Sequence, residues 1–414
     1  MTREITQCRI CGSTVLEPIL SLGNQQLTGV FPRTPLQRIT CGPLDLVKCR
    51  GNGNCGLVQL RHSYPAGEMY GERYGYRSGL NQSMVAHLKS TVKCLLGKSR
   101  LAATDLVLDI GSNDGTLLSG YPDTVTRVGM DPTAGQFLRH YQPGIEVVVD
   151  FFSAAAFQDR YRNRKAKIIT SIAMFYALES PISFVEQVAS ILDDNGLWHF
   201  EQSYLPTMLA TNAYDTVCHE HLEYYGLKQV KWMLDRCGLK IVDVELNAVN
   251  GGSFAVTAAK VDAALPENTA VVQRLLDAEA RAGLATALPY EQFRRRVFKH
   301  RDDLLAQLDG LARQGASVLG YGASTKGNVI LQFCGITPER LPCIAEVNPD
   351  KFGCFTPGTG IPIVSEEQAH AMRPDYLLVL PWHFRHNLIE RERVFLDRGG
   401  RMIFPLPEIE IFGR

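Results

Sequence analysis

A short segment in the middle of the chain, ATNAYDTVCHEHLEYYGL from Ala210 to Leu227, concentrates side chains that can move protons. Histidine titrates near neutral pH and a neighbouring carboxylate can orient its ring, so Glu220 beside His221 suits a general base. Two histidines flanking a glutamate could instead bind a cation, but H-E-H differs from the helical i, i+4 spacing of zinc enzymes. A cluster of satisfied polar core groups is the third interpretation. We favour the general base.

Four cysteines near the start of the chain have the spacing of a metal site. Cys8 and Cys11 form a C-x-x-C pair, and Cys49 and Cys55 follow about forty residues later. Zn²⁺ binds four thiolates in a tetrahedron, and a site with no open position is structural. The RGNGN segment inside the second pair is longer than usual, although Gly and Asn favour turns; Cys41 is the alternative ligand. The spacing favours structural zinc over reduced, buried cysteines.

The segment LVLDIGSNDGTLL predicts a strand, a glycine turn and a helix. Gly111 and Gly115 let the backbone approach a ligand at the carboxyl end of the strand. The next strand, RVGMD, ends in Asp131, where a carboxylate can bind both ribose hydroxyls. The spacing is not G-x-G-x-x-G, which disfavours a nicotinamide oxidoreductase. We predict nucleoside binding rather than a purely structural turn, and S-adenosylmethionine fits because it has no pyrophosphate that the turn must hold. Asp150 is expected to contact adenine, although an exposed loop position explains it nearly as well, and Ser171 is expected to line the pocket floor. The predicted cofactor contacts are Asp109, Gly111, Ser112, Asn113, Gly115, Asp131, Pro132, Asp150 and Ser171.

A second glycine turn lies in SVLGYGASTKGN, where Lys326 opens a predicted helix. Backbone N–H groups at a helix N-terminus, together with a lysine, suit a diphosphate. Glycines kept only for packing in a Rossmann-like fold explain the turn equally well. The predicted substrate contacts in this part of the chain are Gly320, Gly322, Lys326, Asn328, Trp382 and His383.

The elements that must position these groups follow an α/β pattern. From Leu106, short apolar runs alternate with amphipathic stretches, which predicts a parallel sheet covered by helices. After a helical connector over residues 268–314 the alternation starts again. We predict three units. These are a zinc-binding knot (1–65), a first Rossmann-like domain with a preceding helical linker (66–265), and a second Rossmann-like domain that includes the connector (266–414).

Composition excludes several classes of protein. The 414 residues carry 43 basic and 43 acidic side chains, a balance without a general attraction to nucleic acid or anionic membranes. No stretch is apolar for the length of a bilayer crossing. The first residues lack the apolar core of a signal peptide, and eleven cysteines in such a chain fit a reducing compartment. We expect a cytoplasmic monomer that binds neither nucleic acid nor membrane.

Taken together, the motifs resemble the three-domain, zinc-binding, S-adenosylmethionine-dependent sugar C-methyltransferases that act on nucleotide-linked 4-keto-6-deoxy sugars. The resemblance covers essentially the whole chain, and the order of its motifs is more specific than any one of them. The motifs are CRICG with CGLVQL, YGERYGYRSGLN, LDIGSNDGTLL, YDTVCHEHLEYY, NGGSF, GYGASTKGN, EVNPDKFG with TPGTGIPI, and LPWHF. The resemblance implies methylation at C3 of a sugar carried by dTDP or GDP, within deoxysugar biosynthesis.

The resemblance also implies roles for individual residues. A ketone at C4 acidifies the C3 hydrogen because its removal gives an enolate, so the enzyme needs a base, a donor to the C4 oxygen and exclusion of water. His221 is then the base, with Glu220 beside it. Tyr76, from the linker after the knot, is a second acid or base near the sugar.

Three positions depart from the family pattern around the predicted sugar site. Glu179 and Asn250 replace histidines that many relatives carry, and Cys218 replaces a tyrosine. They suggest a different sugar or a different donor to the keto oxygen, for which Tyr224 and His219 are candidates. An oxygen or nitrogen methyltransferase acting on a similar sugar is the alternative function, since it needs no ketone. A zinc-ribbon binding module whose α/β domains have lost their activity is disfavoured. Such domains would have no need to keep polar groups that are costly to bury.

Overall fold

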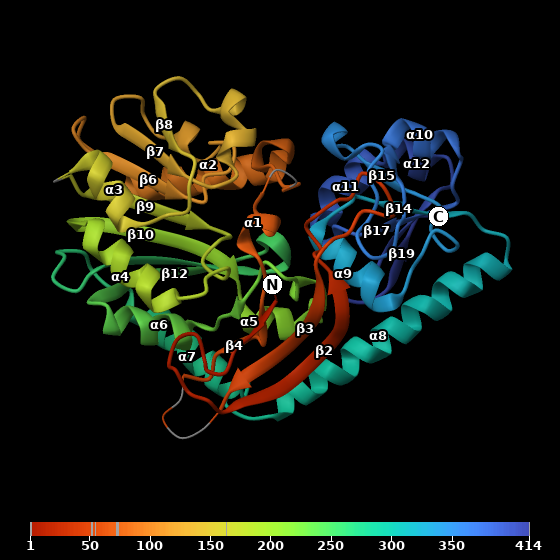
Figure 1. The fold of residues 1–414 in the computed structure, drawn as a ribbon, viewed down its shortest axis with the longest axis horizontal. Coiled ribbons are helices and arrows are strands. Elements are labelled where there is room, and N and C mark those ends of the chain that lie inside the picture. Colours follow the sequence, from red (N-terminus) through yellow and green to blue (C-terminus); the bar gives the residue numbers. More distant parts are fainter. Residues whose placement is uncertain (1, 51–52, 54, 72–73, 163, 414) are drawn as a thin grey trace.

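The computed structural model describes residues 2–50, 53, 55–71, 74–162 and 164–413. Two α/β halves lie side by side, and the long N-terminal strands β2 and β3 run between them (Figure 1). The predicted α/β architecture, with an N-terminal cysteine cluster and two Rossmann-like sheets, is confirmed. None of the described helices combines the length and apolar character needed to cross a bilayer.

The N-terminal sheet has four antiparallel strands in the order β11-β4-β3-β2. Three come from the start of the chain: β2 (Leu16–Gln26), β3 (Cys41–Cys49) and β4 (Val58–Leu60). The fourth, β11 (Glu223–Tyr224), belongs to the histidine-rich segment and pairs Glu223 with Gln59 and Tyr224 with Val58. A small ladder of β1 (Arg3–Glu4) and β5 (His62–Ser63) lies beside it, followed by helix α1 (Ala66–Met69). The end of the histidine-rich segment therefore forms an edge strand of the N-terminal sheet.

The central sheet has seven strands in the order β12-β13-β10-β9-β6-β7-β8, and only β13 runs antiparallel to its neighbours. Its strands are β6 (Leu106–Ile110), β7 (Thr126–Met130), β8 (Ile145–Val148), β9 (Ala166–Ile172), β10 (Leu192–Ser203), β12 (Leu239–Asn247) and β13 (Ser253–Lys260). Because β7 and β9 lie on opposite sides of β6, the order of strand addition reverses at β6, and ligands of such sheets bind at this point.

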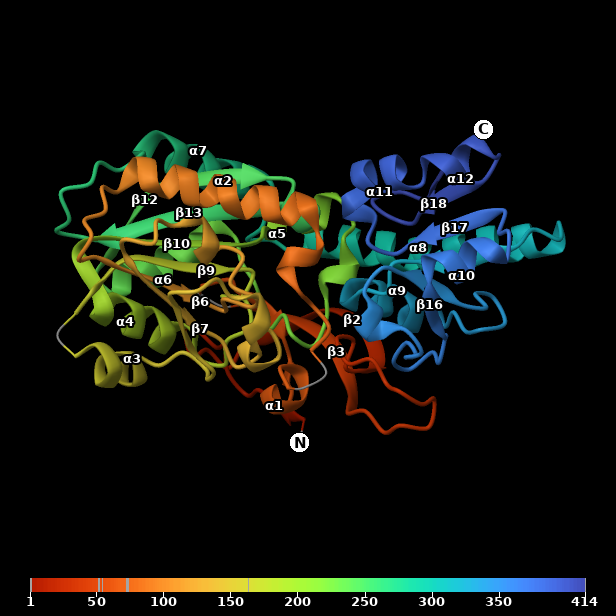
Figure 2. The ribbon, with the colours of Figure 1, turned by 90° about the horizontal axis from the view of Figure 1, so that it is seen from above.

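Alternate residues of the central strands face different helices. Val107 and Ile168 pack with helix α2, whereas Leu108 and Ile169 pack with the helices of the opposite face. In Figure 2, α2 covers one face, and α3, α4 and α6 cover the other. The helices are α2 (Gln82–Lys98), α3 (Ala154–Tyr161), α4 (Pro181–Ile191), α5 (Leu205–Ala210), α6 (Leu227–Arg236) and α7 (Thr269–Arg281).

The helix predicted after the first glycine turn is absent. Only a 3-10 turn over Leu118–Gly120 follows the turn. Pro122 disfavours helical geometry at Tyr121, and a Cβ on Gly120 would lie 3.3 Å from the side chain of Val92 in α2. The prediction of a full helix was therefore wrong, and the segment ends after one 3-10 turn.

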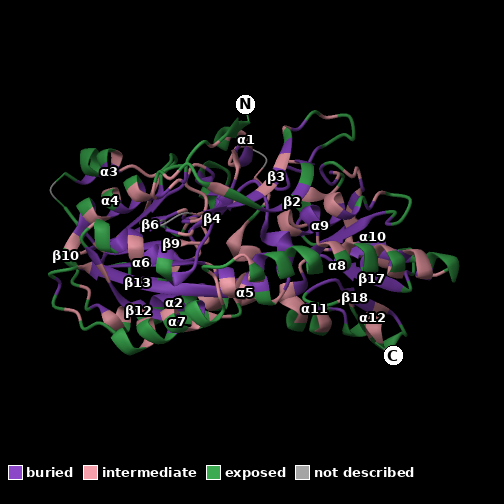
Figure 3. Cartoon of the chain, turned by 90° about the horizontal axis from the view of Figure 1, so that it is seen from below, coloured by how far each residue is buried: buried purple, intermediate pink, exposed green. Residues whose placement is uncertain are grey.

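The connector is helical, as predicted, and consists of α7 and a longer second helix. Helix α8 (Leu288–Arg313) buries Tyr290, Phe293, Val297, His300, Leu304, Leu308 and Leu311. These residues recur every three or four positions and form one stripe, while the opposite face remains exposed (Figure 3).

The C-terminal sheet repeats the architecture with six strands in the order β16-β15-β14-β17-β18-β19. They are β14 (Val318–Tyr321), β15 (Ile344–Glu346), β16 (Ile363–Ser365), β17 (Tyr376–Val379), β18 (Arg401–Phe404) and the antiparallel β19 (Glu410–Phe412). The accompanying helices are α9 (Thr325–Cys334), α10 (Glu366–Ala371), α11 (Arg385–Arg391) and α12 (Arg393–Asp397). In this sheet the order of strand addition reverses at β14, because β15 and β17 lie on its two sides. The carboxyl end of β14 is therefore a second place where a ligand can bind.

Candidate active site between the two halves

Two cavities meet where the carboxyl ends of β6 and β14 approach each other. The β6 cavity, of about 230 Å³, is lined from the ends of β6, β7 and β9. The β14 cavity, of about 630 Å³, is lined from the ends of β14, β15 and β17. Six residues line both cavities: Tyr74, Tyr76, Ala173, Tyr176, Glu220 and His221. The boundary between the cavities therefore contains three of the predicted catalytic residues.

The turn after β6 is built around Asp131. One carboxylate oxygen accepts the backbone N–H of Asn113 at 2.8 Å, and the other accepts the N–H and hydroxyl of Thr133 at 2.5 and 2.6 Å. Each carboxylate oxygen has further lone pairs, and Asp131 lines the cavity. Gly111 (φ 79°) also lines it, in a left-handed conformation that suits glycine. The predicted contacts Asp109, Gly111, Ser112, Asn113, Asp131 and Pro132 all border this cavity.

Asp109 gives the β6 cavity its preference for a cation. Its carboxylate is buried and accepts a hydrogen bond from the Thr170 hydroxyl at 2.6 Å. Burial raises the pKa of Asp109 to about 7, and the nearby charge of Asp131 adds to the rise. A cation bound in the cavity favours the ionised form of Asp109. S-adenosylmethionine carries two cationic groups, its sulfonium and its ammonium.

Three predicted cofactor contacts lie outside the lining. Gly115 (φ 75°) packs under the ring of Tyr141, where a Cβ would lie 2.6 Å from the ring. Ser171 is fully buried and accepts a hydrogen bond from the Trp198 indole at 3.2 Å. Asp150 is exposed, and its carboxylate accepts the backbone N–H of Phe151. The predictions for Ser171 and Asp150 are not supported, because the strand alternation turns Ser171 away and the chain after β8 presents Phe151 and Phe152 to the cavity instead.

Tyr76 is held by the cofactor turn itself. The side-chain amide of Asn113 donates to the Tyr76 carbonyl at 3.1 Å, and its oxygen accepts the N–H of Ser78 at 2.9 Å. A carboxylate oxygen of Asp114 accepts the N–H of Gly79 at 2.8 Å. The Tyr76 side chain is 43% exposed and lines both cavities. Binding at the turn and the position of Tyr76 are therefore coupled through one asparagine.

His221 lies at the boundary between the cavities, and its contacts define which ring nitrogen carries the proton. Its Nδ1 lies 2.8 Å from the carbonyl oxygen of Thr216, and its ring packs against Tyr176 with 4.0 Å between centroids. A carbonyl oxygen only accepts, so Nδ1 carries the proton and Nε2 keeps its lone pair. Burial, reinforced by the charge of Lys326, lowers the pKa of His221 to about 3. The imidazole is therefore a free base at neutral pH.

Glu220 has one carboxylate oxygen without a protein partner among the described residues. Its Oε2 accepts the Thr28 hydroxyl at 3.4 Å, whereas its buried Oε1 makes no hydrogen bond. A Cβ on Gly29 would lie 2.1 Å from this Oε1, so glycine is required there. Burial raises the pKa of Glu220. The Glu220 carboxylate therefore packs against Thr28 and Gly29, while the residue lines both cavities. Thr28 and Gly29 lack any motif that would have revealed them in the sequence.

Three neighbours of His221 lie away from the cavities. His219 is fully buried against Tyr64, with 4.5 Å between ring centroids, and burial lowers its pKa to about 3. Cys218 is also fully buried. The hydroxyl of Tyr224 donates to the same Thr216 carbonyl that holds His221, at 3.3 Å. The expected sugar contacts of His219, Cys218 and Tyr224 are therefore not supported, because the segment folds into the N-terminal sheet there.

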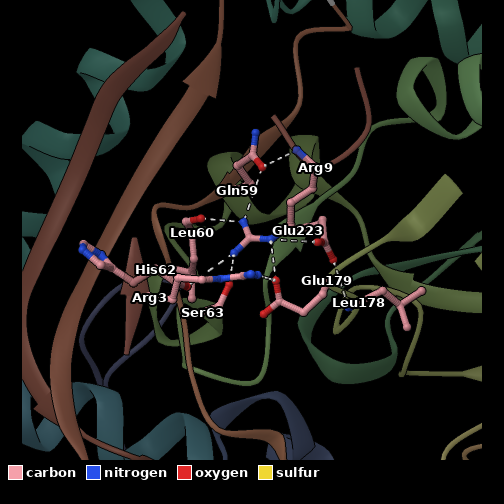
Figure 4. Close-up of polar contacts among 9 residues, drawn as sticks. All are labelled: Arg3, Arg9, Gln59, Leu60, His62, Ser63, Leu178, Glu179 and Glu223. Carbon is pink, nitrogen blue, oxygen red and sulfur yellow. Dashed lines mark hydrogen bonds and ion pairs between the residues drawn. The ribbon is translucent and has the colours of Figure 1, made fainter. Parts of the chain in front are cut away.

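Glu179 is directed toward the knot rather than toward the cavities. Its carboxylate lies 2.9 Å from a guanidinium nitrogen of Arg3 and 4.0 Å from Nε of Arg9 (Figure 4). Its side chain is 43% exposed, and only the adjacent Leu178 lines the β6 cavity. The expected role of Glu179 at the sugar is not supported, because two arginines distant in sequence attract its charge.

The β14 cavity contains the other predicted substrate contacts. Gly322, Lys326, Asn250 and His383 line it. Lys326 is partly buried and donates to the Asn250 carbonyl at 2.7 Å. Its charge, after burial, lowers the pKa values of both His221 and His383, which places the ammonium group near both imidazoles. Lys326 is therefore close to the proposed base.

Three further predicted contacts support this cavity from behind. A Cβ on Gly320 would lie 2.7 Å from Ile344, so that glycine serves strand packing. The Asn328 side chain donates to the Thr28 carbonyl at 2.8 Å, and the Trp382 indole donates to Asp215 at 2.8 Å. None of Gly320, Asn328 and Trp382 lines the cavity. Their predicted contacts with substrate are not supported, because each of the three residues contacts another part of the protein instead.

The four predicted zinc ligands converge on one point. The sulfurs of Cys8, Cys11, Cys49 and Cys55 all lie within 4.8 Å of one another, with the shortest pairs at 3.4 and 3.5 Å. Zn–S bonds of about 2.3 Å in a tetrahedron place sulfurs about 3.8 Å apart, so the arrangement fits Zn²⁺. Cys41 is exposed at the opposite end of β3 and is not a ligand. Most of the RGNGN turn lies outside the described residues.

Comparisons with known proteins agree with this geometry. Family models match residues 8–70 as a zinc binding domain, 86–244 as a methyltransferase domain and 248–407 as a C-methyltransferase C-terminal domain. The chain is 32% identical to C-methyltransferase NovU of Streptomyces niveus over 412 residues, which cover 99% of this chain and 97% of NovU. The chain belongs to this C-methyltransferase family.

Two solved structures show a partial similarity to the chain. One is an S-adenosylmethionine-dependent methyltransferase from Clostridium acetobutylicum, with 11% identity, 42% of this chain and 92% of that chain covered, and a TM-score of 0.33. Another is the plantazolicin methyltransferase BpumL in complex with SAH, with 10% identity, 42% and 82% coverage, and a TM-score of 0.34.

The family assignment establishes two ligands of the C-methyltransferase. S-adenosylmethionine is the methyl donor and zinc is structural. Sequence reasoning missed the aromatic pair Tyr74 and Tyr176 at the cavity boundary. It also missed Glu346, whose carboxylate accepts the N–H of Ala323 at 2.8 Å, as Asp131 does for Asn113. An acidic residue at the end of the second strand was the available signal, because the same rule had identified Asp131.

Proposed function

We propose that this enzyme methylates C3 of a nucleotide-linked 4-keto-6-deoxy sugar by base-assisted enolate formation. The observation that supports the proposal most directly is that His221 borders both cavities. A base at that boundary reaches a substrate in one cavity while the methyl donor occupies the other. In-line transfer to carbon needs this opposed arrangement of donor and substrate.

His221 acts as the base through Nε2. Because Nδ1–H is donated to Thr216, the Nε2 lone pair is available to accept the C3 proton. When bound, S-adenosylmethionine supplies an electrophilic methyl group. The rings of Tyr74 and Tyr176 line both cavities and help to exclude water from the boundary. The Glu220 carboxylate, beside His221 at the same boundary, binds a sugar hydroxyl.

Lys326 stabilises the oxygen that becomes negative when the C3 proton leaves. One of its three N–H groups is donated to Asn250, which leaves two for a ligand. A buried cation stabilises a developing oxyanion more strongly than one in water. Lys326 thereby takes the role of donor to the C4 oxygen for which Tyr224 and His219 had been considered. We assign it to the sugar ring rather than to the diphosphate.

The nucleotide of the substrate occupies the outer part of the β14 cavity. Gly322 (φ 82°), next to the N-terminus of α9, lets a ligand approach the backbone closely. His386 and Arg391 line the same cavity from α11 and add positive charge or hydrogen-bond donors for a diphosphate. The volume of about 630 Å³ suits a ligand of sugar-nucleotide size.

The test is incubation of the purified enzyme with S-adenosylmethionine and a panel of dTDP- and GDP-linked 4-keto-6-deoxy sugars. We expect one product to gain a methyl group on carbon. In D₂O without methyl donor, the same sugar exchanges its C3 hydrogen for deuterium, and the His221→Asn variant does not. Methylation of oxygen or nitrogen without C3 exchange would instead establish the alternative chemistry.

A further inference from the structure

Arg9 occupies an unusual place for a charged residue. It lies inside the C-x-x-C turn, between the zinc ligands Cys8 and Cys11, and its side chain is only 2% exposed. Its guanidinium group donates to the Leu60 carbonyl at 2.6 Å and to the Ser63 hydroxyl at 2.9 Å (Figure 4). These bonds attach the metal-binding turn to the strands β4 and β5.

The same guanidinium faces a buried carboxylate of the catalytic segment. Nε of Arg9 lies 3.6 Å from Oε1 of Glu223, whose side chain is completely buried. The other oxygen of Glu223 accepts the backbone N–H of Leu178, a residue that lines the β6 cavity, at 3.4 Å. Glu223 is two residues after His221, so one side chain connects the knot, the cavity wall and the proposed base.

The backbone supports the same connection. β11, which contains Glu223, pairs with β4 of the N-terminal sheet, and the N–H of Leu60 donates to the Leu222 carbonyl at 2.9 Å. The segment from Thr216 to Leu222 thus spans from the His221 anchor to the edge of this sheet. Leu222 and Glu223 also donate their backbone N–H groups to the Tyr176 carbonyl at 2.7 and 3.1 Å, and the Arg9–Glu223 contact adds a side-chain connection from this segment to the knot.

Buried ion pairs are a poor means of gaining stability. Removing two charges from water is costly, and well-packed apolar residues often stabilise a fold equally well, whereas removing one partner leaves an uncompensated charge. The planar guanidinium does what an apolar side chain cannot: it donates in fixed directions to Leu60 and Ser63 while its charge faces the Glu223 carboxylate. Directional anchoring fits a positioning role better than a purely stabilising one.

We propose that the zinc knot positions the catalytic histidine through the buried Arg9–Glu223 pair. Zinc orders the Cys8–Cys11 turn, the turn orients Arg9, and Arg9 holds Glu223 and the adjoining loop so that His221 faces both cavities. Arg9 and Glu223 are positioning residues and do not touch the substrate. The proposal rests on the assignment of His221 as the base.

The test compares Arg9→Met and Glu223→Gln with the control Arg3→Met. Arg3 belongs to the same cluster but is 70% exposed and pairs with the half-exposed Glu179, so its removal should change nothing. We expect both test variants to retain one zinc per chain. Amide hydrogen exchange should accelerate in the peptide over residues 214–224, and kcat should fall about 10- to 100-fold with a smaller change in KM. If Arg9→Met does not fold, Arg9→Lys, which keeps the charge but loses the planar fork, replaces it.

Two results would overturn the proposal: wild-type kcat in both test variants, or reduced kcat with unchanged exchange over residues 214–224. Zinc content and amide exchange require no substrate. If no 4-keto sugar is methylated by the wild-type enzyme, the proposed function fails, while the exchange measurement still decides whether Arg9 and Glu223 hold this loop.

Discussion

The Nδ1 atom of His221 and the carbonyl oxygen of Thr216 lie 2.8 Å apart, and this contact selects the tautomer of the proposed base. Because the carbonyl can only accept, the proton is on Nδ1 and the lone pair is on Nε2. The two residues belong to one short loop, so the orientation of the ring is set locally. Its position between the cavities is set by the N-terminal sheet.

Replacing His221 with Asn should abolish both C3 exchange and methyl transfer. We expect turnover to fall by about 10²- to 10⁴-fold, the usual contribution of a general base. S-adenosylhomocysteine binding, measured by calorimetry, should change little because the Asp131 turn remains. The matched control is His219→Asn, two residues away and outside both cavities, which should keep wild-type turnover. Equal losses in the two variants would contradict the assignment.

The pH dependence should reflect the low pKa of His221. The base works unprotonated, and a pKa of about 3 keeps it so throughout the range in which free histidine would become protonated. The kcat/KM value should therefore show no decline from a histidine as pH falls from 8 to 5. Lys326→Met removes a neighbouring positive charge, so the pKa of His221 rises and the acid limb moves to higher pH.

Comparing Lys326→Met with Lys326→Arg tests whether the charge of Lys326, rather than its packing, affects turnover and the pKa of His221. Loss of the Lys326 charge should reduce kcat about 100-fold, as loss of an oxyanion donor does. A wild-type acid limb centred near pH 6.5, unchanged in Lys326→Met, would show that the lysine charge does not act on His221. Lys326→Arg keeps the charge and should retain the acid limb of the wild-type enzyme.

Cys55 and Cys41 distinguish the two candidates for the fourth zinc ligand. Cys55→Ser should lose the metal and at least about 3 kcal/mol of unfolding free energy, since a structural site contributes directly to folding. Cys41→Ser should keep one zinc per chain, because Cys41 is exposed at the far end of β3. Zinc is measured by elemental analysis and stability by denaturant titration. Full zinc content in Cys55→Ser would be inconsistent with the four-thiolate site.

Asp131 and Asp150 distinguish the two predicted acidic cofactor contacts. Asp131→Ala removes a carboxylate that holds two backbone N–H groups of the turn and faces the β6 cavity. The dissociation constant of S-adenosylhomocysteine should rise about 10- to 100-fold, which corresponds to one lost charged hydrogen-bonding group. Asp150→Ala should leave it unchanged, because that side chain is exposed. A large effect at Asp150 would relocate the adenine site.

The sequence by itself determined what depends on local spacing. The four cysteines, Asp131 after the second strand and the Glu220–His221 pair were all identifiable, because short motifs place their side chains within one turn or at one sheet edge. The two sheets followed from alternating apolar segments. Each of these inferences needed information from one segment or from regularly repeated ones.

The tertiary structure decided which of several similar residues face the ligands. His219 and His221 are two residues apart, yet one packs against Tyr64 of the N-terminal domain and the other borders both cavities. Glu179 is directed away by Arg3 and Arg9 from the start of the chain. These outcomes depend on packing and charge partners more than a hundred residues away in sequence, which no local pattern records. Distant contacts, rather than residue type, set the orientation of these side chains.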